Sequence, residues 1–340
     1  MSRPVLSQET PDNQLPPTEK DGLAAESTPL SSTKSASSRL SDFLKNFTSN
    51  RKALAGLIII GIFLLIAIFG PIFLRQDPNA FSSDALQSPS SAHWLGTTNL
   101  GQDVFTQVID GTRASILWGL ATALIATFLS VVIGIATGYL EGVGADVLVM
   151  VINVFLVLPG LPLIVLVVAY SPVRGPLTVA LVLAFTNWAY QARVLRAQTL
   201  SLKARDFVVA ARASGESTWK ILFWEILPNE IAIVVSGFIG TLIYVIGAAA
   251  GVEFLGLSDV TTIDWGTILF WAQNNSALLQ GAWWWFAAPG ICLAGLGAGL
   301  VLLNFSIDEI ADPRLRSEIH RKPRIKRWSL IPVGKVQPAP

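Results

Sequence analysis

The residues with the most informative spacing lie in a polar segment between two long apolar stretches. This segment, residues 206–228, contains an Ala-Ala pair that ends at Ala211, a glycine four residues later at Gly215, and a Leu-Pro pair that ends at Pro228. Glycine readily ends a helix, and proline cannot continue one from within. The spacing predicts two short helices, the first broken at Gly215 and the second ended by Pro228. The chemistry indicated is binding rather than catalysis, because two short helices on a membrane face form a docking surface for another protein.

Composition places this segment in a membrane protein. The chain has 340 residues, 52% of them hydrophobic and only 14% charged, an apolar excess too large for a soluble domain. The net charge of +1 gives no indication of nucleic-acid binding. Cys292 is the only cysteine, and His93 and His320 lie far apart in the sequence. We therefore expect no disulfide, no metal site and no catalytic residue.

Six apolar stretches are each near the ~20 residues that a helix needs to cross a bilayer. They cover residues 53–74, 115–140, 147–170, 175–192, 231–252 and 285–307. The first stretch follows a long polar segment, too late for a cleaved signal peptide, and we expect it to be an anchor. The predicted fold class is all-α, a polytopic membrane protein with six transmembrane helices and a cytoplasmic loop that carries the docking surface.

Basic residues predict the orientation of these helices. Of the 24 Lys and Arg residues, only Arg75, Arg113 and Arg174 lie on one side of the predicted membrane. The others precede the first stretch, lie in 193–230 or follow the last stretch. Because cytoplasmic segments carry the excess of Lys and Arg, we expect both termini and the 193–230 loop in the cytoplasm.

The flanks differ from the membrane core in composition. The Ser-, Thr- and Pro-rich N-terminal residues predict disorder, and the basic C-terminal residues either contact lipid head groups or form a solvated tail. The expected organisation is a disordered cytoplasmic tail over 1–48, a first transmembrane helix over 49–74, an extracytoplasmic loop over 75–114, a five-helix core over 115–316 with the loop 193–230, and a basic cytoplasmic tail over 317–340.

The six stretches contain no Asp, Glu, Lys, Arg or His. Ion-coupled carriers commonly use ionisable groups inside the membrane, so this absence favours another source of energy. The only Gly-Lys pair, Gly334-Lys335, is followed by Val336 and has Ser329 where a phosphate-binding loop needs glycine. We therefore expect no cofactor bound by this chain and a separate ATPase subunit.

Glycines and prolines inside the stretches predict close helix packing and one bend. Three pairs of glycines are spaced four residues apart: Gly134 and Gly138, Gly247 and Gly251, and Gly295 and Gly299. They allow helices to approach closely, either within the chain or against a second membrane subunit. Pro159 and Pro162 are expected to kink or unwind the third helix.

Uncharged polar residues inside the stretches are candidates for the lining of a transport pathway. They are Asn153, Thr186, Asn187, Ser236, Thr241, Tyr244 and Asn304. For each of them, the alternative is a hydrogen bond between helices.

The loops expected outside the membrane carry a helix cap and several tryptophans. Asp103 can cap a helix that leads towards the second apolar stretch. The loop 253–283 contains Trp265 and Trp271 and runs into three consecutive tryptophans, 283–285. Such clusters favour the lipid head-group layer, and a sugar-stacking site is the alternative.

Residues 206–228 resemble the signature loop of ABC importer permeases, in which Glu-Ala-Ala precedes a glycine and a Leu-Pro pair at this spacing. In that family the loop is the coupling helix, which binds in a cleft of the ATPase subunit. The resemblance implies the coupling residues Val209, Ala210, Ala211, Gly215, Leu227 and Pro228. Val209 replaces the leading glutamate of the family. Because the apolar residues 207–211 are unsuited to water, we expect Val209 to be buried against the ATPase cleft or the chain's own helix ends.

Further segments, in the family's order, resemble the permeases of dipeptide, oligopeptide and nickel importers. They are His93, Leu95-Gly96-Thr97, Gly101, Asp103-Val104-Phe105, Gly111, Arg113, Ser115, Phe254-Leu255-Gly256-Leu257, Trp265-Gly266, Pro289-Gly290 and Asp312-Pro313-Arg314-Leu315-Arg316. The last segment resembles a marker of the second permease of a pair. Departures from the family pattern are Trp94 for Pro, Thr98 for Asp, Gln102 for Arg, Ala249 for Glu, and Asn304-Phe305 for Gly-Asp.

The resemblance implies a non-catalytic, multi-pass permease of a prokaryotic plasma (inner) membrane that moves peptides by alternating access. The implied partners are a second permease, two ATPase subunits that bind ATP and Mg, an extracytoplasmic substrate-binding protein and membrane lipid, with no nucleic acid. Two alternatives stay open: an ATP-independent carrier or channel, and a non-transporting or weakly coupled scaffold, which Val209 suggests. The cargo could be a dipeptide, a longer peptide, glutathione or a metal chelate.

Overall fold

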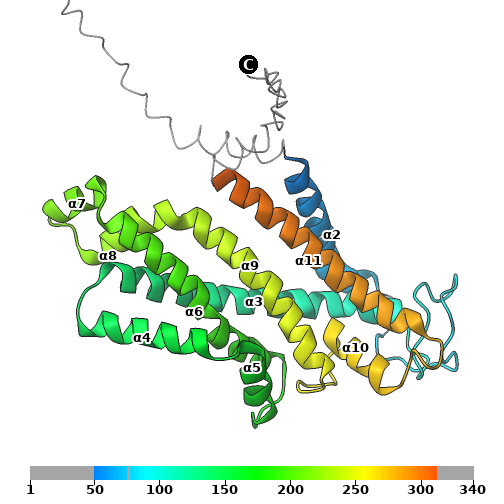
Figure 1. Cartoon of the computed structure of the whole chain (residues 1–340). Helices are drawn as coiled ribbons and strands as arrows, with labels where there is room; N and C mark the ends of the chain where they lie inside the picture. Colours follow the sequence, from blue (N-terminus) through cyan, green and yellow to red (C-terminus); the bar gives the residue numbers. More distant parts are fainter. Residues whose placement is uncertain (1–49, 75–76, 312–340) are drawn as a thin grey trace, which may run out of the picture. The chain divides into compact units, whose positions relative to one another are not determined.

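The computed structural model describes residues 50–74 and 77–311, most of which are helical (Figure 1). The long helices are α2 (Arg51–Phe73), α3 (Val104–Tyr139), α6 (Pro176–Lys203), α9 (Leu227–Phe254) and α11 (Trp283–Ala311). The shorter ones are α4 (Val143–Val157), α5 (Gly160–Ala169), α7 (Asp206–Ala213), α8 (Thr218–Lys220), the π-helix η1 (Ile221–Ile226) and α10 (Trp265–Asn274). Within the described residues, which exclude the predicted tails 1–48 and 317–340, the all-α prediction is confirmed.

Four of these helices are long and apolar enough to cross a bilayer: α2, α3, the continuous helix Thr218–Phe254 that contains α9, and α11. The pair α4 and α5 is a fifth candidate if it forms one bent span. The fourth predicted stretch, 175–192, forms α6, which is not among these candidates. Its apolar run is interrupted by Asn187 and Gln191, and basic residues begin at Arg193. The structure thus supports four or five spans by length and composition.

The predicted bend at Pro159 is confirmed. Helix α4 ends at Val157, and α5 begins at Gly160 in a direction that differs by 89°. Pro159 is the N-cap residue of α5, where its missing N–H costs no helical hydrogen bond. Pro162 follows within the first turn of α5, so both prolines are placed at the start of a new helix.

Helix α3 begins well before the predicted stretch at residue 115. The Asp103 side chain accepts a hydrogen bond from the backbone N–H of Thr106 at 2.8 Å, which confirms the predicted cap. A Cβ at Gly111 would lie 3.1 Å from Asp264 Cα, so this first part of α3 is in close contact with the residues before α10. Within the predicted segment 75–114, residues 104–114 are therefore helical, because capping and packing hold them in a helix despite their polar side chains.

Helices α3 and α6 are in close contact because of Gly134 and Gly138. A Cβ at Gly134 would lie 2.7 Å from the carbonyl oxygen of Ala192, and one at Gly138 would lie 2.6 Å from Thr199 Cβ. A larger residue at either position would push the two helices apart. For this pair, the prediction of close helix approach is confirmed within the chain.

The other two glycine pairs differ from each other. A Cβ at Gly299 would lie 2.7 Å from Ile59 Cγ2, so α11 packs closely against α2. By contrast, a Cβ at Gly247 or Gly251 would meet no described atom within 4 Å. These two glycines line an apolar groove of about 490 Å³ between α5 and α9. Contact with a second membrane subunit therefore stays a prediction for Gly247 and Gly251 alone.

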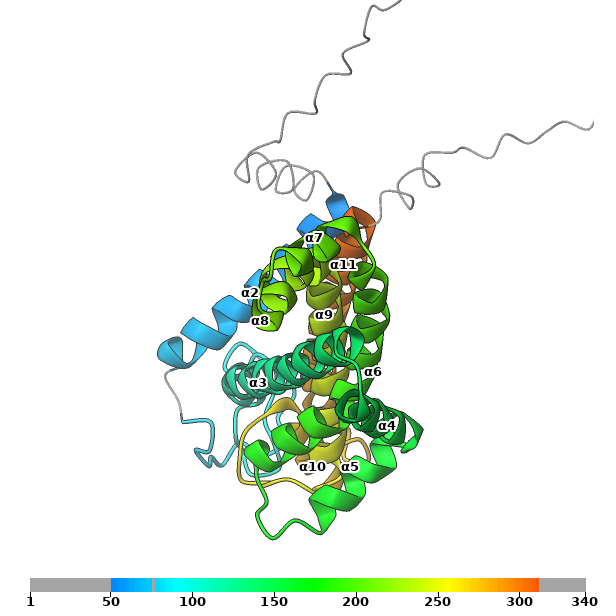
Figure 2. The same cartoon turned by 90° about the vertical axis from the view of Figure 1, so that its left-hand side faces the viewer.

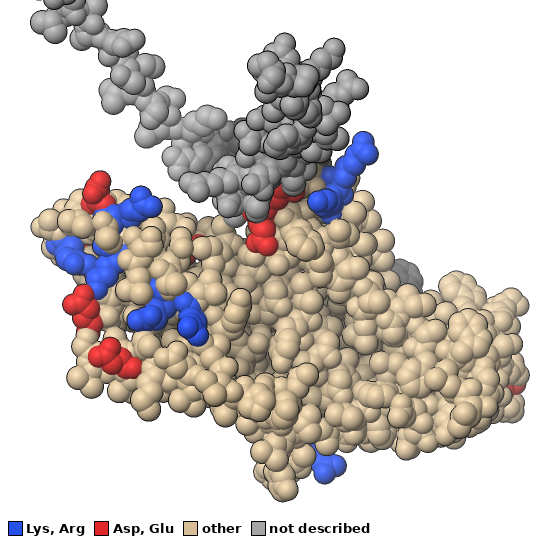
Figure 3. Space-filling model, viewed as in Figure 1, with Lys and Arg blue, Asp and Glu red and all other residues tan. Residues whose placement is uncertain are grey.

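The loop helices α7 and α8 lie at one end of the bundle, and the 77–103 loop and α10 lie at the other (Figure 1). Helix α9 runs from the first end to the second. Figure 2 views the bundle from the end that carries α7 and α8. Charged side chains gather at this end, whereas most of the surface between the two ends carries none (Figure 3). That distribution agrees with a bilayer around the middle of the bundle.

Candidate coupling surface and translocation cavity

The segment with the Ala-Ala, Gly and Leu-Pro spacing forms two short helices at the end of the bundle. The first, α7, ends where Gly215 adopts a left-handed conformation with φ of +75°. The N–H of Glu216 donates to the carbonyl of Ala211 at 3.2 Å, which satisfies a carbonyl at the helix end. Ser217 then caps α8. The predicted break at Gly215 is therefore confirmed.

The predicted end at Pro228 is wrong. Residues Thr218–Phe254 form one continuous helix, and Leu227 and Pro228 lie in the first turn of α9 within it. The preceding turn is the π-helix η1, which is wider than an α-helix. A wide turn gives the proline ring room against the carbonyl of the turn before it, so the helix continues through Pro228. As a consequence, the loop is joined rigidly to a long membrane helix.

The expectation that Val209 is buried against the chain's own helix ends is also wrong. Its neighbour Val208 is fully buried, whereas Val209 is 52% exposed. Val208 packs with Ile135 and Tyr139 of α3 and with Ile221 of η1. On a helix, adjacent residues point in directions about 100° apart, so one of the two valines must face outwards. Val209 is therefore available to a partner subunit.

Aromatic side chains continue this exposed surface beyond α7. Phe207 and Val209 are exposed on α7, and Trp219 and Trp224 are exposed on α8 and η1. The rings of Trp219 and Phe223 stack with centroids 4.9 Å apart. Basic and acidic side chains gather at the same end of the bundle (Figure 3). We call Phe207, Val209, Trp219 and Trp224 the docking patch.

Tyr139 at the end of α3 holds α7 and the end of α6 together. The guanidinium of Arg212 lies 5.3 Å from the centre of its ring, and the ammonium of Lys203 lies 5.7 Å from it. Lys203 also forms an ion pair with Glu141, and this hydrogen bond lowers the pKa of the Glu141 carboxyl. The aromatic ring of Tyr139 thus attaches the loop to α3 through its contacts with these two cations.

A cavity of about 670 Å³ lies between α6, α9 and α11. Five of the seven predicted pathway residues line it: Asn187, Ser236, Thr241, Tyr244 and Asn304. Asn153 does not; it is exposed on α4. Thr186 donates its hydroxyl to the Val182 carbonyl of its own helix at 2.9 Å. The structure therefore gathers most of the candidates and separates Asn153 and Thr186 from them.

Sequence reasoning missed two polar groups of this cavity, Gln191 and Asp308. The Ser236 hydroxyl lies 2.6 Å from Asp308 Oδ1 and 3.1 Å from Asn304 Oδ1. Gln191 donates from its amide to the Ile233 carbonyl at 3.0 Å. Asp308 was missed because it follows the apolar stretch by one residue, and Gln191 because it lies at the polar end of another. These contacts give the cavity a polar wall on three helices.

The carboxyls at the two ends of α9 were missed for the same reason. Glu230 precedes the predicted stretch and Glu253 follows it, and both are buried. Glu253 faces Asp264, the residue that caps α10, and burial raises the pKa of Asp264. A Cβ at Gly266 would lie within 2.5 Å of Glu253 Cβ, so this contact leaves no room for a larger residue. The end of α9 opposite the docking patch is therefore fixed to α10.

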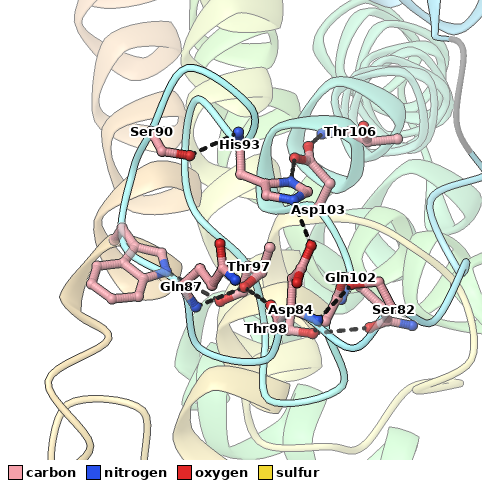
Figure 4. Close-up of polar contacts among 12 residues, drawn as sticks. Ser82, Asp84, Gln87, Ser90, His93, Thr97, Thr98, Gln102, Asp103 and Thr106 are labelled. Carbon is pink, nitrogen blue, oxygen red and sulfur yellow. Dashed lines mark hydrogen bonds and ion pairs between the residues drawn. The ribbon is translucent and has the colours of Figure 1, made fainter.

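The 77–103 loop at the same end of the bundle is ordered by its own polar contacts (Figure 4). His93 lies between two carboxylates, with Nδ1 2.8 Å from Asp103 Oδ2 and Nε2 3.7 Å from Asp84 Oδ2. The backbone N–H of Thr97 donates to the Gln87 carbonyl at 3.0 Å. Such a loop presents fixed side chains rather than a changing surface.

Two of the three consecutive tryptophans are part of the packing below this loop, so the expectation of a head-group belt is wrong for them. Trp284 and Trp285 are buried, and only Trp283 is largely exposed. The indole N–H of Trp284 donates to the Thr97 carbonyl at 3.2 Å. A Cβ at Gly96 would lie 2.6 Å from Trp284 Nε1, which explains the glycine and its φ of +69°. The run of tryptophans thus supports the loop.

An all-helical membrane chain with an exposed docking loop at one end and a polar cavity between its helices defines a transport subunit. Comparison with protein families agrees with this class. Residues 130–317 match the family described as the binding-protein-dependent transport system inner membrane component. Residues 38–89 match the N-terminal transmembrane domain of oligopeptide transport permease C. The chain belongs to this family of ABC transporter permeases.

Curated relatives cover most of the chain. It is 31% identical over 280 residues to the oligopeptide transport system permease protein OppC of Bacillus subtilis, which covers 81% of this chain and 90% of that protein. It is 32% identical to the dipeptide permease DppC of Alkalihalophilus pseudofirmus, over 80% of this chain and 89% of that protein. The glutathione permease GsiD of Pectobacterium atrosepticum is 30% identical, over 81% of this chain and 91% of that protein.

Membership of this family fixes several general properties. The chain is a multi-pass inner-membrane component of a peptide-type ABC transport family, and such permeases are non-catalytic. A permease that depends on a binding protein works with that protein and with an ATPase. The predictions of a permease, of peptide transport as the family's theme and of a non-enzymatic role are therefore confirmed.

Proposed function

We propose that this chain is one of two permease subunits of an importer that moves peptides across the inner membrane by alternating access. Two ATPase subunits would bind and hydrolyse ATP with Mg, and an extracytoplasmic binding protein would deliver the cargo. The six predicted spans, with α6 as one of them, would place both termini and the loop in the cytoplasm. Val209 and its apolar neighbours would bind the ATPase where the family has a glutamate.

The observation that carries this proposal is the continuous helix Thr218–Phe254. It begins beside the docking patch and supplies Ser236, Thr241 and Tyr244 to the cavity wall. A rigid helix transmits a displacement of one end to the other. When the ATPases close, a shift of α7 and α8 would therefore change the cavity. Only a difference in docking free energy between the two states can drive such a shift.

Peptide cargo is favoured because the cargoes named for the relatives share one chemistry. Their names refer to oligopeptides, dipeptides and glutathione, all of which contain amide bonds. The 670 Å³ cavity falls in the usual range for sites that hold small ligands. Its wall offers amide, hydroxyl and carboxylate groups, which suit a peptide rather than an apolar solute.

Uptake by proteoliposomes tests this function. Vesicles that contain both permeases and the ATPases, with binding protein outside and ATP inside, are expected to accumulate a labelled peptide. Vesicles without ATP are expected to accumulate none. Uptake that persists without ATP would indicate an independent carrier, and a complete vesicle that takes up no peptide would indicate a different cargo or a scaffold.

A further inference from the structure

A second cavity, of about 420 Å³, lies at the end of the bundle opposite the docking patch. Its walls come from the 77–103 loop, from the residues around α10 and from the start of α3 and α11. Its rim is open, because Phe81, Leu100 and Trp271 are exposed there. The translocation cavity between α6, α9 and α11 shares no residue with it. We call this second cavity the outer pocket.

The lining of the outer pocket is polar but contains no charged side chain among the described residues. It has five side-chain amides: Asn79, Asn99, Gln102, Gln107 and Asn275. These amides hold one another in place. Asn99 donates to Asn275 Oδ1 at 2.8 Å across 176 residues of sequence, and Gln107 donates to Gln102 Oε1 at 3.0 Å. The pocket is therefore ordered before any ligand binds.

Trp285 forms a buried part of the wall of the outer pocket. Its side chain is only 2% exposed and its indole nitrogen is buried, so a ligand in the pocket would contact the ring and not the N–H. The amides are more accessible, because Asn79 is exposed and Asn99, Gln102 and Asn275 are partly exposed. Their remaining donors and acceptors are therefore open to a ligand.

We propose that the outer pocket binds a short uncharged stretch of peptide from the cargo, with the main-chain N–H and C=O groups of the peptide bonded to the lining amides. This inference rests on the proposed peptide transport. Side-chain amides offer both donors and acceptors, which match the N–H and C=O of a peptide bond. Trp271, Leu100 and Ile268 provide apolar walls for side chains. Because no lining charge would neutralise a peptide end, the pocket suits the interior of a peptide or a peptide with blocked ends.

Saturation-transfer NMR on the complete transporter in nanodiscs, without ATP, tests this proposal. The probe is the N-acetylated, C-amidated tripeptide Ala-Leu-Ala. The variant Asn275→Leu keeps the approximate size of the side chain and removes a lining amide, and it is expected to weaken binding roughly 3- to 10-fold, the value of one hydrogen bond. The matched control, Asn274→Leu, removes an exposed amide outside the pocket and is expected to bind the probe like the native chain.

A second variant keeps the test independent of the folding of Asn275→Leu. Thr261 is exposed at the rim, so Thr261→Trp is expected to fill the pocket and abolish binding, whereas Gln273→Trp on the exposed side of α10 is not. Equal binding by the native chain and both pocket variants would overturn the proposal, as would no binding to the native chain. If Thr261→Trp instead abolishes only recruitment of the binding protein, the pocket serves protein docking and the cargo site is wrong.

Uptake measurements on the same purified transporters, reconstituted into vesicles, separate this proposal from the proposed function. A transporter that imports peptide but does not bind the probe at the outer pocket contradicts the pocket alone. A transporter that binds the probe there but imports no peptide contradicts the proposed function alone.

Discussion

Thr199 donates a hydrogen bond from its hydroxyl to the carboxyl of Glu230, with 2.7 Å between Oγ1 and Oε1. Thr199 lies near the end of α6 and Glu230 near the start of α9, and both are fully buried. The bond thus joins the two helices that enter and leave the coupling loop. The second oxygen of Glu230 has no hydrogen-bond partner among the described residues. At the base of the loop, the buried Glu230 carboxyl therefore relies on the hydrogen bond from Thr199 as its one side-chain hydrogen bond among the described residues.

Thr199→Val is expected to destabilise the permease by about 1–3 kcal/mol, because it keeps the shape and leaves a buried carboxyl without its donor. Thermal unfolding of the purified transporter measures the loss. The double variant Thr199→Val, Glu230→Leu removes the acid as well and is expected to recover part of the stability. If Thr199→Val unfolds at the same temperature as the native protein, the hydrogen bond contributes nothing to stability.

Gly215→Val is expected to separate folding from docking. Gly215 has a positive φ, so valine strains the turn by roughly 1 kcal/mol, but a Cβ there would meet no described atom within 4 Å. We expect the variant to reach the membrane and to copurify with less ATPase. Gly215→Asn tolerates this backbone conformation and serves as the control. Normal ATPase recovery and normal transport by both Gly215→Val and Ala211→Trp would reject the docking role.

Val209→Glu tests the nature of the contact with the ATPase. Val209 is exposed, so the substitution should leave the stability of the isolated permease unchanged, and it should weaken assembly if the contact is apolar. The buried neighbour gives the matched comparison, since Val208→Glu is expected to unfold the loop by placing a charge among Ile135, Tyr139 and Ile221. A Val209→Glu transporter that assembles better and works faster would identify this subunit as a weakened coupler.

The sequence predicts those elements that depend on local chemistry. Asp103 caps a helix, Pro159 starts a new one, and Gly215 ends one because capping side chains, proline rings and glycine conformations act within a few residues. The order of the helices follows equally well from the apolar stretches. These features need no knowledge of what the helices contact.

The features that the sequence did not predict depend on contacts between distant residues. Pro228 continues a helix because of the π turn before it, and Val209 is exposed because Val208 takes the inner position. Trp285 is buried because the 77–103 loop and α10 fold over it. Glu230 lies just outside an apolar stretch, and only the packing of α6 against α9 buries it. A pattern within a few residues of the sequence does not predict such contacts.

Topology gives a further test of the proposed orientation. In a Cys292→Ala background, single cysteines at Ser217 and Ser329 are expected to face the cytoplasm, and those at Ser83 and Asn274 to face outwards. The asymmetry of basic residues is the physical reason. An impermeant thiol reagent added to intact cells should label only the second pair. Labelling of the Ser217→Cys variant from outside would overturn the orientation.

Cross-linking from Val209 tests the central claim, that this chain receives its energy through the docking patch. In the Cys292→Ala background, Val209→Cys in the assembled transporter is expected to cross-link to the ATPase subunit with a short bifunctional thiol–amine reagent, in a yield that changes when ATP is added. Leu278→Cys, exposed between α10 and α11, is the control and should give no such product, because α10 lies at the opposite end of the bundle. If Val209→Cys and Leu278→Cys both fail to cross-link while the transporter still imports peptide, the ATPase does not bind at this loop and the account is wrong.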